Sequence, residues 1–447
     1  MGAVSQPTPV PGPQSAPDAE VVELCRELIR IDTSNYGDSS GPGERKAAEY
    51  VAEKLAEVGL ETTVFESEPG RTTVVTRIEG ADPARTDALL VHGHLDVVPA
   101  DAADWRHDPF SGEIADGCVW GRGAVDMKDM DAMILSVVRD RMRTGRRPAR
   151  PLVLAFLADE EAGGKLGAHF AVDHYAELFE GATEAISELG GFSLTVRDDL
   201  RLYLVETAQK GIDWMRLTVT GTAGHGSMMN DDNAVVELAE AVTRLGRYDW
   251  PVRVTPAVQA FLDAAGEAYG VELDPNDPEQ LLATLGNVGR VVGATLRNTA
   301  NPTMLKAGYK HNVVPGRAEA YVDGRFLPGY EEEFEATLDE ILGPNVTRES
   351  LVRDIAVQTD FSGSLVDAMS TALLAEDPGA RTVPYCVFGG TDAKSFSLLG
   401  IRNFGFAPLR LPADLDFAGM FHGVDERVTL DGLRFGARVL DRFLDLA

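Results

Sequence analysis

Two long runs of mostly apolar residues constrain the fold of this chain more than any other feature of its sequence. They are "ALLVHGHLDVV" (residues 88–98) and "PLVLAFLADEEAGG" (residues 151–164), and neither alternates regularly between polar and apolar residues. A strand that is apolar on both sides needs cover on both faces, which is typical of parallel sheets. Helical patterns alternate with these runs, for example "DAEVVELCRELIRIDTSN" (residues 18–35). This order predicts an α/β fold, with a mostly parallel sheet that carries helices on both faces.

The length of the chain and a change of pattern near residue 211 predict an inserted domain. The 447 residues exceed the roughly 250–300 residues over which a single core grows. Residues 211–355 include strands that alternate between polar and apolar residues, such as "WMRLTVTGTAGHGS". We therefore expect a first domain of residues 18–210 and 356–447, interrupted by an α+β domain of residues 211–355.

Two segments lack a clear pattern. Residues 1–17 are rich in proline, serine and glutamine, and they have neither a basic start nor an apolar stretch. We expect a disordered tail there rather than a signal peptide. Residues 247–300 are poorly patterned, and we predict no elements within them.

The charge balance of the chain indicates which partners it can bind, and its cysteines indicate the cellular compartment. The chain has 41 Lys and Arg against 71 Asp and Glu, a net charge of −30. Such a surface repels phosphate backbones and anionic membranes, so we expect neither nucleic-acid nor membrane partners. Three separated cysteines without a CxxC pair argue against a disulfide framework or a thiolate zinc site. We expect a cytoplasmic protein.

A histidine and an aspartate at the end of the first apolar run form the first candidate site. His94 and Asp96 share one face of a strand, because alternate residues of a strand point the same way. A histidine that binds a metal ion commonly donates its other ring N–H to a carboxylate. A loop histidine bonded to a local carboxylate is the alternative, and on this motif alone it is the commoner case. We interpret His92 as a packed core residue.

Acidic residues follow at two further places. Asp126 stands in "GRGAVDMKD" just before a predicted helix, where capping that helix is its alternative role. Three acids, Asp159 to Glu161, follow the second apolar run in "FLADEEAGG". A solvated acidic turn is the alternative, although the apolar strand before it argues against that interpretation. Neighbouring carboxylates raise one another's pKa unless a cation neutralises them.

The last two places lie farther along the chain. Glu184 and Glu188 share strand parity in "EAISELGG", and His422 stands beside acids in "FHGVDERV". Open α/β sheets keep their sites at the carboxyl ends of their strands, where side chains from all five places are expected to converge. Oxygen and imidazole ligands without cysteine suit a two-metal hydrolytic centre. Zinc is the favoured ion, with cobalt or manganese as substitutes.

Seven motifs in order resemble those of a known family. They are "GHLDVVP", "GRGAVDMKD", "DEEAGG", "GTAGHGS", "NVVPGRAEAYVDGR", "GGTDAKSF" and "HGVDE", and together they span nearly the whole chain. The family is that of the co-catalytic zinc amidohydrolases. It includes aminoacylase, carboxypeptidase G, carnosine dipeptidase, acetylornithine deacetylase and succinyl-diaminopimelate desuccinylase.

The resemblance implies a role for each candidate residue. Two zinc ions would have five ligands: His94 and Glu188 for one ion, Glu161 and His422 for the other, and Asp126 for both. Asp96 would orient His94. Glu160 would be the general base that takes a proton from the metal-bridging water and passes it to the leaving amine. Glu188 stands in the least diagnostic motif, and Glu184 is its alternative. The resemblance also implies a cis peptide bond between Asp126 and Met127.

The inserted domain resembles the family's lid, which often also forms a homodimer interface. His225 would stabilise the oxyanion across that interface, and a turn histidine between glycines is the alternative. Asn312 and Arg325 would bind substrate, since arginine fits a carboxylate. The alternative for Arg325 is a salt bridge to Asp323. Backbone N–H groups nearby would come from Gly389, Gly390 and Thr391.

We therefore predict a zinc-dependent hydrolase that cleaves the amide bond of N-acyl amino acids or dipeptides with a free carboxylate. An acetylornithine deacetylase or a succinyl-diaminopimelate desuccinylase is the alternative within the family. An inactive metal-binding relative is the alternative of another class, and the presence of Glu160 and all five ligand candidates argues against it. A simple α/β binding protein with acids only on its surface would bind no metal tightly.

Overall fold

The computed structural model describes residues 16–447, and these form two compact units. The first unit contains residues 16–203, 362–381 and 399–447, and the second contains Leu204–Phe361 and Thr382–Leu398. The tail predicted for residues 1–17 lies outside the described residues except for its last two. Of these, Ala16 donates to Asp140 and Pro17 accepts from Ser136.

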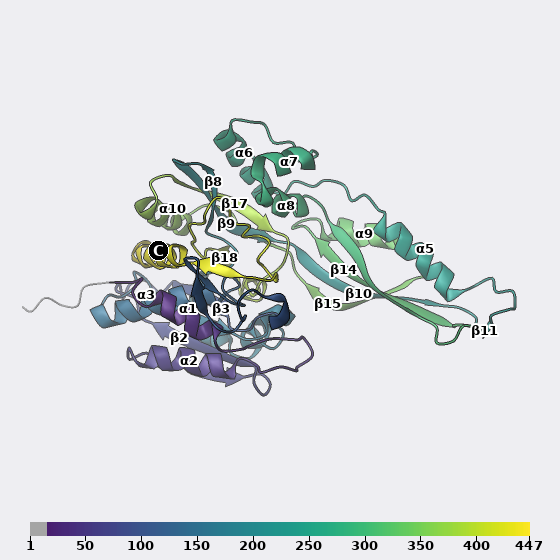
Figure 1. Cartoon of the computed structure of the whole chain (residues 1–447), viewed down its shortest axis with the longest axis horizontal. Helices are drawn as coiled ribbons and strands as arrows, with labels where there is room; N and C mark the ends of the chain where they lie inside the picture. The colour runs from purple at the N-terminus through teal and green to yellow at the C-terminus, as the bar shows by residue number, and fades with distance from the viewer. Residues whose placement is uncertain (1–15) are drawn as a thin grey trace, which may run out of the picture. The chain divides into compact units, whose positions relative to one another are not determined.

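A mixed sheet forms the centre of the first unit (Figure 1). Its strands in spatial order are β1 (Thr63–Glu66), β2 (Thr72–Ile78), β6 (Leu152–Leu157), β3 (Ala88–His94), β7 (Ala182–Ser187) and β18 (Arg402–Gly405). The strands from β6 to β18 are parallel, whereas β1 and β2 are antiparallel to their neighbours. All residues of β3 and β6 are buried, so both faces of the sheet are covered there. The predicted α/β class is confirmed.

Helices cover this sheet. They are α1 (Val21–Ile29), α2 (Arg45–Ala56), α3 (Lys128–Thr144), α4 (Ala168–His174), α10 (Ser364–Glu376) and α12 (Leu430–Leu446). The central helix α3 packs against α1 and α12, and its first 14 residues are all buried. Such a helix fixes the position of the residues just before it, which include Asp126.

A small sheet joins two distant parts of the first unit. Its strands are β4 (Glu113–Ala115), β5 (Cys118–Trp120) and β19 (Arg427–Thr429). The antiparallel pairing of β5 with β19 sets Trp120 opposite Arg427. The segment that carries His422 therefore meets the segment that leads to Asp126. Strand β8 (Phe192–Arg197) and the first residues of β9 (Leu200–Gln209) complete this unit.

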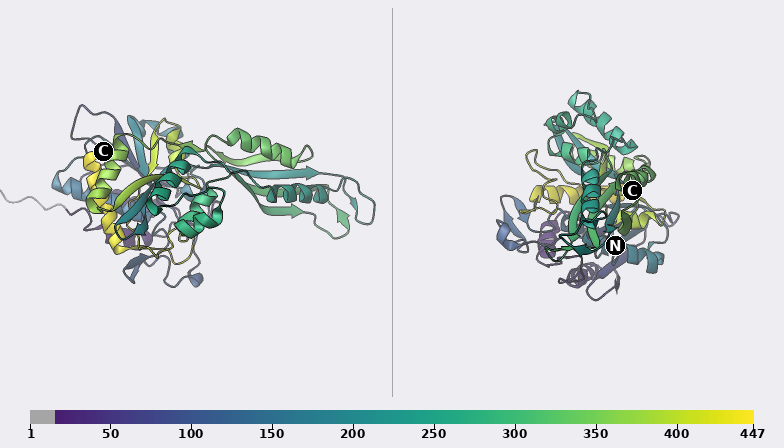
Figure 2. Two further views of the ribbon diagram at one scale, coloured as in Figure 1. Left: turned by 90° about the horizontal axis from the view of Figure 1, so that it is seen from above. Right: turned by 90° about the vertical axis from the view of Figure 1, so that its right-hand side faces the viewer.

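The second unit is built on an antiparallel sheet. Its strand order is β12 (Thr299–Ala307), β14 (Arg317–Phe326), β10 (Gly211–Thr220) and β15 (Thr347–Asp354). Burial alternates along β10, and the helices α5 (Ala234–Gly246) and α9 (Glu331–Leu342) pack on the buried face (Figures 1 and 2). A short ribbon of β11 (Gly224–His225) and β13 (Val313–Val314) extends it.

This unit also takes segments that the sequence analysis assigned to the first domain. They are the end of β9, then β16 (Val357–Gln358), β17 (Ala380–Val387) from Thr382 onward, and α11 (Ala393–Ser397). Both β16 and β17 pair with β9, and this pairing has no signature in the local pattern of residues.

Three helices occupy the stretch for which no elements were predicted. They are α6 (Pro256–Tyr269), α7 (Pro278–Leu285) and α8 (Asn287–Ala294). Thr255 and Asp277 cap α6 and α7, and each is followed by a proline at the first helical position. Thr-Pro and Asp-Pro are therefore start signals that the weak periodicity of this stretch obscured.

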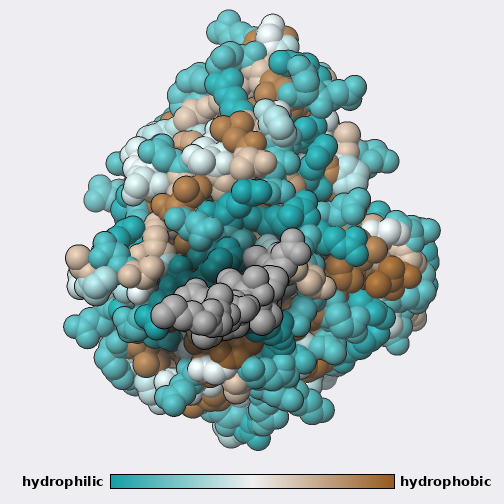
Figure 3. Space-filling model, turned by 90° about the vertical axis from the view of Figure 1, so that its left-hand side faces the viewer, coloured by the Kyte–Doolittle hydropathy of each residue, from teal (hydrophilic) through white to brown (hydrophobic). Residues whose placement is uncertain are grey.

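The surface agrees with the charge of the chain. Hydrophilic residues predominate on the face that Figure 3 shows. Within residues 16–447, no helix combines the length and the apolar character that a membrane crossing requires.

Candidate metal and catalytic site

The predicted ligands meet at one edge of the sheet in the first unit. His94 is the last residue of β3, Glu188 follows β7, and Glu160 and Glu161 lie in the turn η2 (Glu160–Ala162) after β6. These three strands are parallel neighbours, so their carboxyl ends lie together. Two loops complete the site: Asp126 precedes α3, and His422 precedes β19.

Asp126 lies between two histidines. Its Oδ1 is 3.2 Å from Nε2 of His94, and its Oδ2 is 3.4 Å from Nε2 of His422. Beyond them, Glu188 lies 3.6 Å from His94 and Glu161 lies 3.0 Å from His422. The five side chains thus form two groups that share one carboxylate.

The donor atoms are close enough to surround cations. Ligand atoms of His94, Asp126 and Glu161 all lie within 4.8 Å of one another, and those of His94, Glu160 and Glu188 form a second such group. Imidazole nitrogens and carboxylate oxygens at this spacing fit zinc, cobalt or manganese. The residues present therefore fit a dinuclear metal centre.

Burial disfavours the ionised form of two carboxyl groups at the site, those of Glu188 and Glu161. Burial raises the pKa of Glu188 to about 7. Burial and the nearby Asp126 also raise the pKa of Glu161. Hydrogen bonds with Asp126 and Glu161 raise the pKa of His422 to about 10. Carboxylates in such surroundings are ionised at neutral pH only when positive charge is close, which a divalent cation supplies.

Asp96 contacts His94 mainly through its backbone. Nδ1 of His94 donates to the carbonyl oxygen of Asp96 at 2.9 Å, whereas the carboxylate is 3.6 Å away. The carboxylate of Asp96 accepts from the backbone N–H groups of Glu160 and Glu161, both at 3.1 Å. Asp96 therefore fixes the turn of the general-base candidate as well as the ring of His94.

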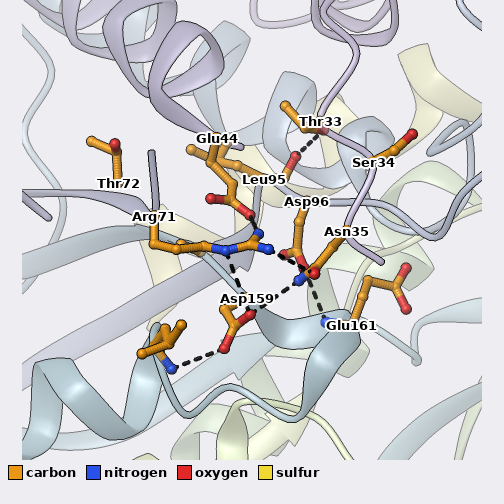
Figure 4. Close-up of polar contacts among 12 residues, drawn as sticks. Thr33, Ser34, Asn35, Glu44, Arg71, Thr72, Leu95, Asp96, Asp159 and Glu161 are labelled. Carbon is orange, nitrogen blue, oxygen red and sulfur yellow. Dashed lines mark hydrogen bonds and ion pairs between the residues drawn. The ribbon is translucent and has the colours of Figure 1, made fainter. Parts of the chain in front are cut away.

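A buried network that the sequence analysis missed holds Asp96 in place (Figure 4). Asn35 donates to the carboxylates of Asp96 at 2.8 Å and Asp159 at 3.1 Å. Arg71 donates to Asn35 at 2.8 Å and pairs with the fully buried Glu44. Asn35, Glu44 and Arg71 carry no motif, and only their burial distinguishes them from surface residues.

The structure also shows the peptide bond after Asp126 and the surroundings of His92 and Glu184. The peptide bond between Asp126 and Met127 is cis, as expected. His92 is 1% exposed, and burial lowers its pKa to about 3, so it is a neutral core residue. Glu184, the alternative to Glu188, is bound to Arg150 at 2.8 Å and Arg402 at 3.2 Å, which excludes it from the centre.

The candidates in the second unit form two local groups. His225 pairs with Val313 across the β11–β13 ribbon, and Gly226 donates to the carbonyl of Asn312 at 2.9 Å. His225 and Asn312 are therefore neighbours, and both are exposed. Arg325 forms the alternative salt bridge, with Nε 2.6 Å from Oδ1 of Asp323.

The segment of Gly389, Gly390 and Thr391 differs in one respect from the expectation. The N–H of Thr391 donates to Oε1 of Gln209 at 2.9 Å, while Gln209 donates back to the Thr391 hydroxyl at 2.8 Å. This N–H is therefore already bonded and is not available to a substrate. At Gly390, a Cβ atom would lie 2.5 Å from Nζ of Lys394, so a larger residue there would displace the end of that side chain.

The network around Asn35 predicts a loss of stability. Asn35→Ala removes one hydrogen-bond donor from each of the buried carboxylates of Asp96 and Asp159, and we expect the free energy of unfolding to fall by roughly 2–4 kcal/mol. Urea unfolding measures this change. Asn345→Ala, which removes an exposed hydrogen bond to Glu237, is the matched control and should cost less than about 0.5 kcal/mol. Equal effects of the two substitutions would contradict the importance of the network.

Comparisons with known proteins identify the family and the fold of this chain. The model of peptidase family M20/M25/M40 matches residues 90–446. Aminoacylase-1 of Sus scrofa is 28% identical over 418 residues, which cover 91% of this chain and 90% of that protein. The structure of an M20 family metallo-carboxypeptidase, Sso-CP2 from Sulfolobus solfataricus, has a TM-score of 0.72 at 18% identity and covers 96% of this chain and 99% of that chain.

Human carnosine dipeptidase 1 has the same fold. Its structure has a TM-score of 0.67 at 15% identity and covers 96% of this chain and 95% of that chain. At these identities the structural likeness shows the fold alone, whereas the family match shows membership. The chain therefore belongs to peptidase family M20/M25/M40 and, as expected, is a hydrolase of amide or peptide bonds.

Proposed function

We propose that this protein is a metal-dependent hydrolase that cleaves the amide bond of N-acyl amino acids or dipeptides next to a free carboxylate. One observation carries the proposal: the two oxygens of Asp126 face His94 and His422, with Glu188 and Glu161 beyond them. Aminoacylase-1 and carnosine dipeptidase 1 are similar proteins whose names indicate these two substrate classes.

Five residues would hold two divalent cations, with zinc favoured. They are His94 and Glu188 for one ion, Glu161 and His422 for the other, and Asp126 for both. When bound, the ions supply the Lewis acidity that polarises an amide carbonyl and makes water nucleophilic at neutral pH. The backbone carbonyl of Asp96 holds Nδ1 of His94, which leaves Nε2 directed at Asp126.

Glu160 is the general base in this proposal. One of its carboxylate oxygens lies within 4.8 Å of ligand atoms of His94 and Glu188, and its backbone N–H is held by Asp96. Asp159, just before it, has a left-handed backbone with φ of 66°, so the chain turns sharply after β6. The side chain is thereby placed to take a proton from water and deliver it to the leaving amine.

The second unit would supply the substrate contacts. Arg325 is the candidate for the substrate carboxylate, and Asp323 already accepts from its Nε and Nη2. A substrate would therefore bind the remaining nitrogen of the guanidinium or displace Asp323. Asn312, the N–H groups of Gly389 and Gly390, and His225 at the oxyanion complete the proposed set.

A homodimer is part of the proposal, because apolar side chains are exposed beside His225. Met229 in the loop after β11 is 95% exposed, and Tyr309 in the loop before β13 is 84% exposed. The pairing of β11 with β13 makes these loops neighbours. Exposed apolar residues that gather in this way are typical of protein interfaces.

The cytoplasmic location also remains a proposal. Cys25, Cys118 and Cys386 are all free and buried, which is compatible with a reducing compartment.

Glu160→Gln tests the catalytic role of the base. The variant should retain both metal ions and fold normally, while kcat falls by about 10²–10⁴-fold because only the proton acceptor is lost. Kinetics together with metal analysis measure this result. Glu79→Gln, at an exposed position, should leave kcat unchanged. Near-normal turnover of Glu160→Gln would contradict the mechanism.

A substrate panel tests the specificity. N-acyl amino acids and dipeptides should be hydrolysed, and their C-terminal amides should lose at least about tenfold in kcat/KM because a charged partner of arginine is removed. Acetylornithine and succinyl-diaminopimelate belong in the same panel, since a clear preference for either would favour the anabolic alternative. Equal rates for acids and amides would exclude carboxylate recognition.

Size-exclusion chromatography with light scattering, which measures the molar mass of the eluting protein, tests the dimer. The wild type should have twice the mass of the chain, and the double variant Met229→Glu, Tyr309→Glu should be a monomer because charges then face each other across the interface. Leu282→Glu, at another exposed apolar position of the second unit, should remain dimeric. A monomeric wild type would refute this part of the proposal.

A further inference from the structure

Glu426 has no role in the proposed chemistry, yet its side chain is fully buried beside the site. It ends the "HGVDE" motif, four residues after His422. Its carboxylate accepts four hydrogen bonds, two at each oxygen. The donors are Nη1 of Arg122 at 2.8 Å and N of Gly123 at 3.0 Å on Oε2, and N of Val125 at 2.7 Å and N of Asp126 at 3.2 Å on Oε1.

These bonds join two segments that are about 300 residues apart in the sequence. The pairing of β5 with β19 continues into a bond from N of Gly121 to the carbonyl of Glu426 at 3.0 Å. The backbone hydrogen bonds between these two segments end there. The side chain of Glu426 then binds the turn that leads to Asp126. A single carboxylate thus satisfies backbone N–H groups that would otherwise be buried without partners.

Arg122 also joins the segment before Asp126 to the loop that carries His422. Its Nη2 donates to the carbonyl of Gly423 at 2.8 Å, while its Nη1 binds Glu426. The guanidinium also lies over the ring of Trp105, 5.1 Å from the ring centre. The planar fork of one arginine therefore contacts both ends of the segment 423–426, next to His422.

The backbone of the ligands is held in place differently in the two halves of the proposed metal centre. His94 is the last residue of β3 and pairs with Leu157 of β6, and Glu188 directly follows β7 in the same sheet. Asp126 and His422 stand in loops, and the side chain of His422 is 58% exposed, so packing constrains it little. The distance from His422 to Asp126 depends instead on bonds between their loops.

We propose that Glu426, with Arg122, is a positioning residue. It fixes the relative positions of the ligands in one half of the centre, which Asp126, Glu161 and His422 form. It acts through the backbone of the Asp126 turn and touches neither substrate nor metal. This inference rests on the proposed dinuclear centre. It predicts an asymmetric effect, in which loss of the Glu426 carboxylate weakens the site of Glu161 and His422 more than the site of His94 and Glu188, although Asp126 would serve both.

Metal titration of Glu426→Gln tests this inference. The amide nitrogen of glutamine cannot accept, so two of the four donors lose their partner while the size of the side chain is kept. We expect the second equivalent of Zn²⁺ to bind metal-depleted protein about 10–100-fold more weakly than in the wild type, and the first equivalent to lose much less affinity. Calorimetry measures both affinities, and the absorption spectrum of Co²⁺-loaded protein reports the coordination of each ion. His422→Ala should weaken the same equivalent.

Asp377→Asn is the matched control. Asp377 is also a buried carboxylate, and it accepts from Arg201, from the Tyr203 hydroxyl at 2.9 Å and from the N–H of Gly379 at 3.1 Å. Its loss should destabilise the fold without changing either metal affinity. If Glu426→Gln does not fold, Arg122→Lys keeps the charge and loses the fork, and it should weaken the second equivalent to a smaller degree.

The outcomes separate this inference from the proposed function. Wild-type affinity for both equivalents in Glu426→Gln or Arg122→Lys would overturn the positioning role and leave the proposed function intact. Equal weakening of both equivalents, in Glu426→Gln and Asp377→Asn alike, would show general destabilisation and would also overturn it. A wild type that binds fewer than two ions would instead refute the dinuclear centre, and the inference with it.

Discussion

The parallel pairing of β3 with β6 and β7 is the constraint on which the rest of the site depends. It brings His94, the turn of Glu160 and Glu161, and Glu188 to one edge of the sheet, although more than 90 residues separate the first from the last. No local interaction could do this, because each of these residues follows a different strand. The site is thus a direct consequence of sheet order, as in other open α/β sheets.

So many buried acids at one edge require compensation, and the first unit supplies it in two ways. Arginines are buried with the carboxylates outside the proposed ligand set: Arg71 pairs with Glu44, and Arg122 pairs with Glu426. Backbone N–H groups bind the carboxylate of Asp96. Within residues 16–447, the acids of the proposed ligand set form ion pairs with histidines and not with arginines, so they remain available to cations. An acidic chain can therefore concentrate carboxylates without losing its fold.

The second unit carries its candidate substrate residues outside its buried core. Its sheet has one buried face, which α5 and α9 cover, so the other elements of the unit are free to carry exposed loops and ribbons. His225 lies on the β11–β13 ribbon, and Asn312 and the exposed apolar residues lie on the loops beside it. Candidate substrate residues on loops of a rigid scaffold are common among enzymes, because loops vary without disturbing a core.

The sequence by itself determined the fold class and pointed to the acidic and imidazole side chains at the strand ends, because apolar runs and polar motifs are local patterns. It failed at residues 247–300, where capping signals were present but periodicity was weak. Only the tertiary structure decided that Asn35, Arg71 and Glu426 support the site and that Gln209 occupies the N–H of Thr391. Each of these depends on a contact between segments distant in the chain, and burial of a polar residue by such a contact leaves no periodic trace in the sequence.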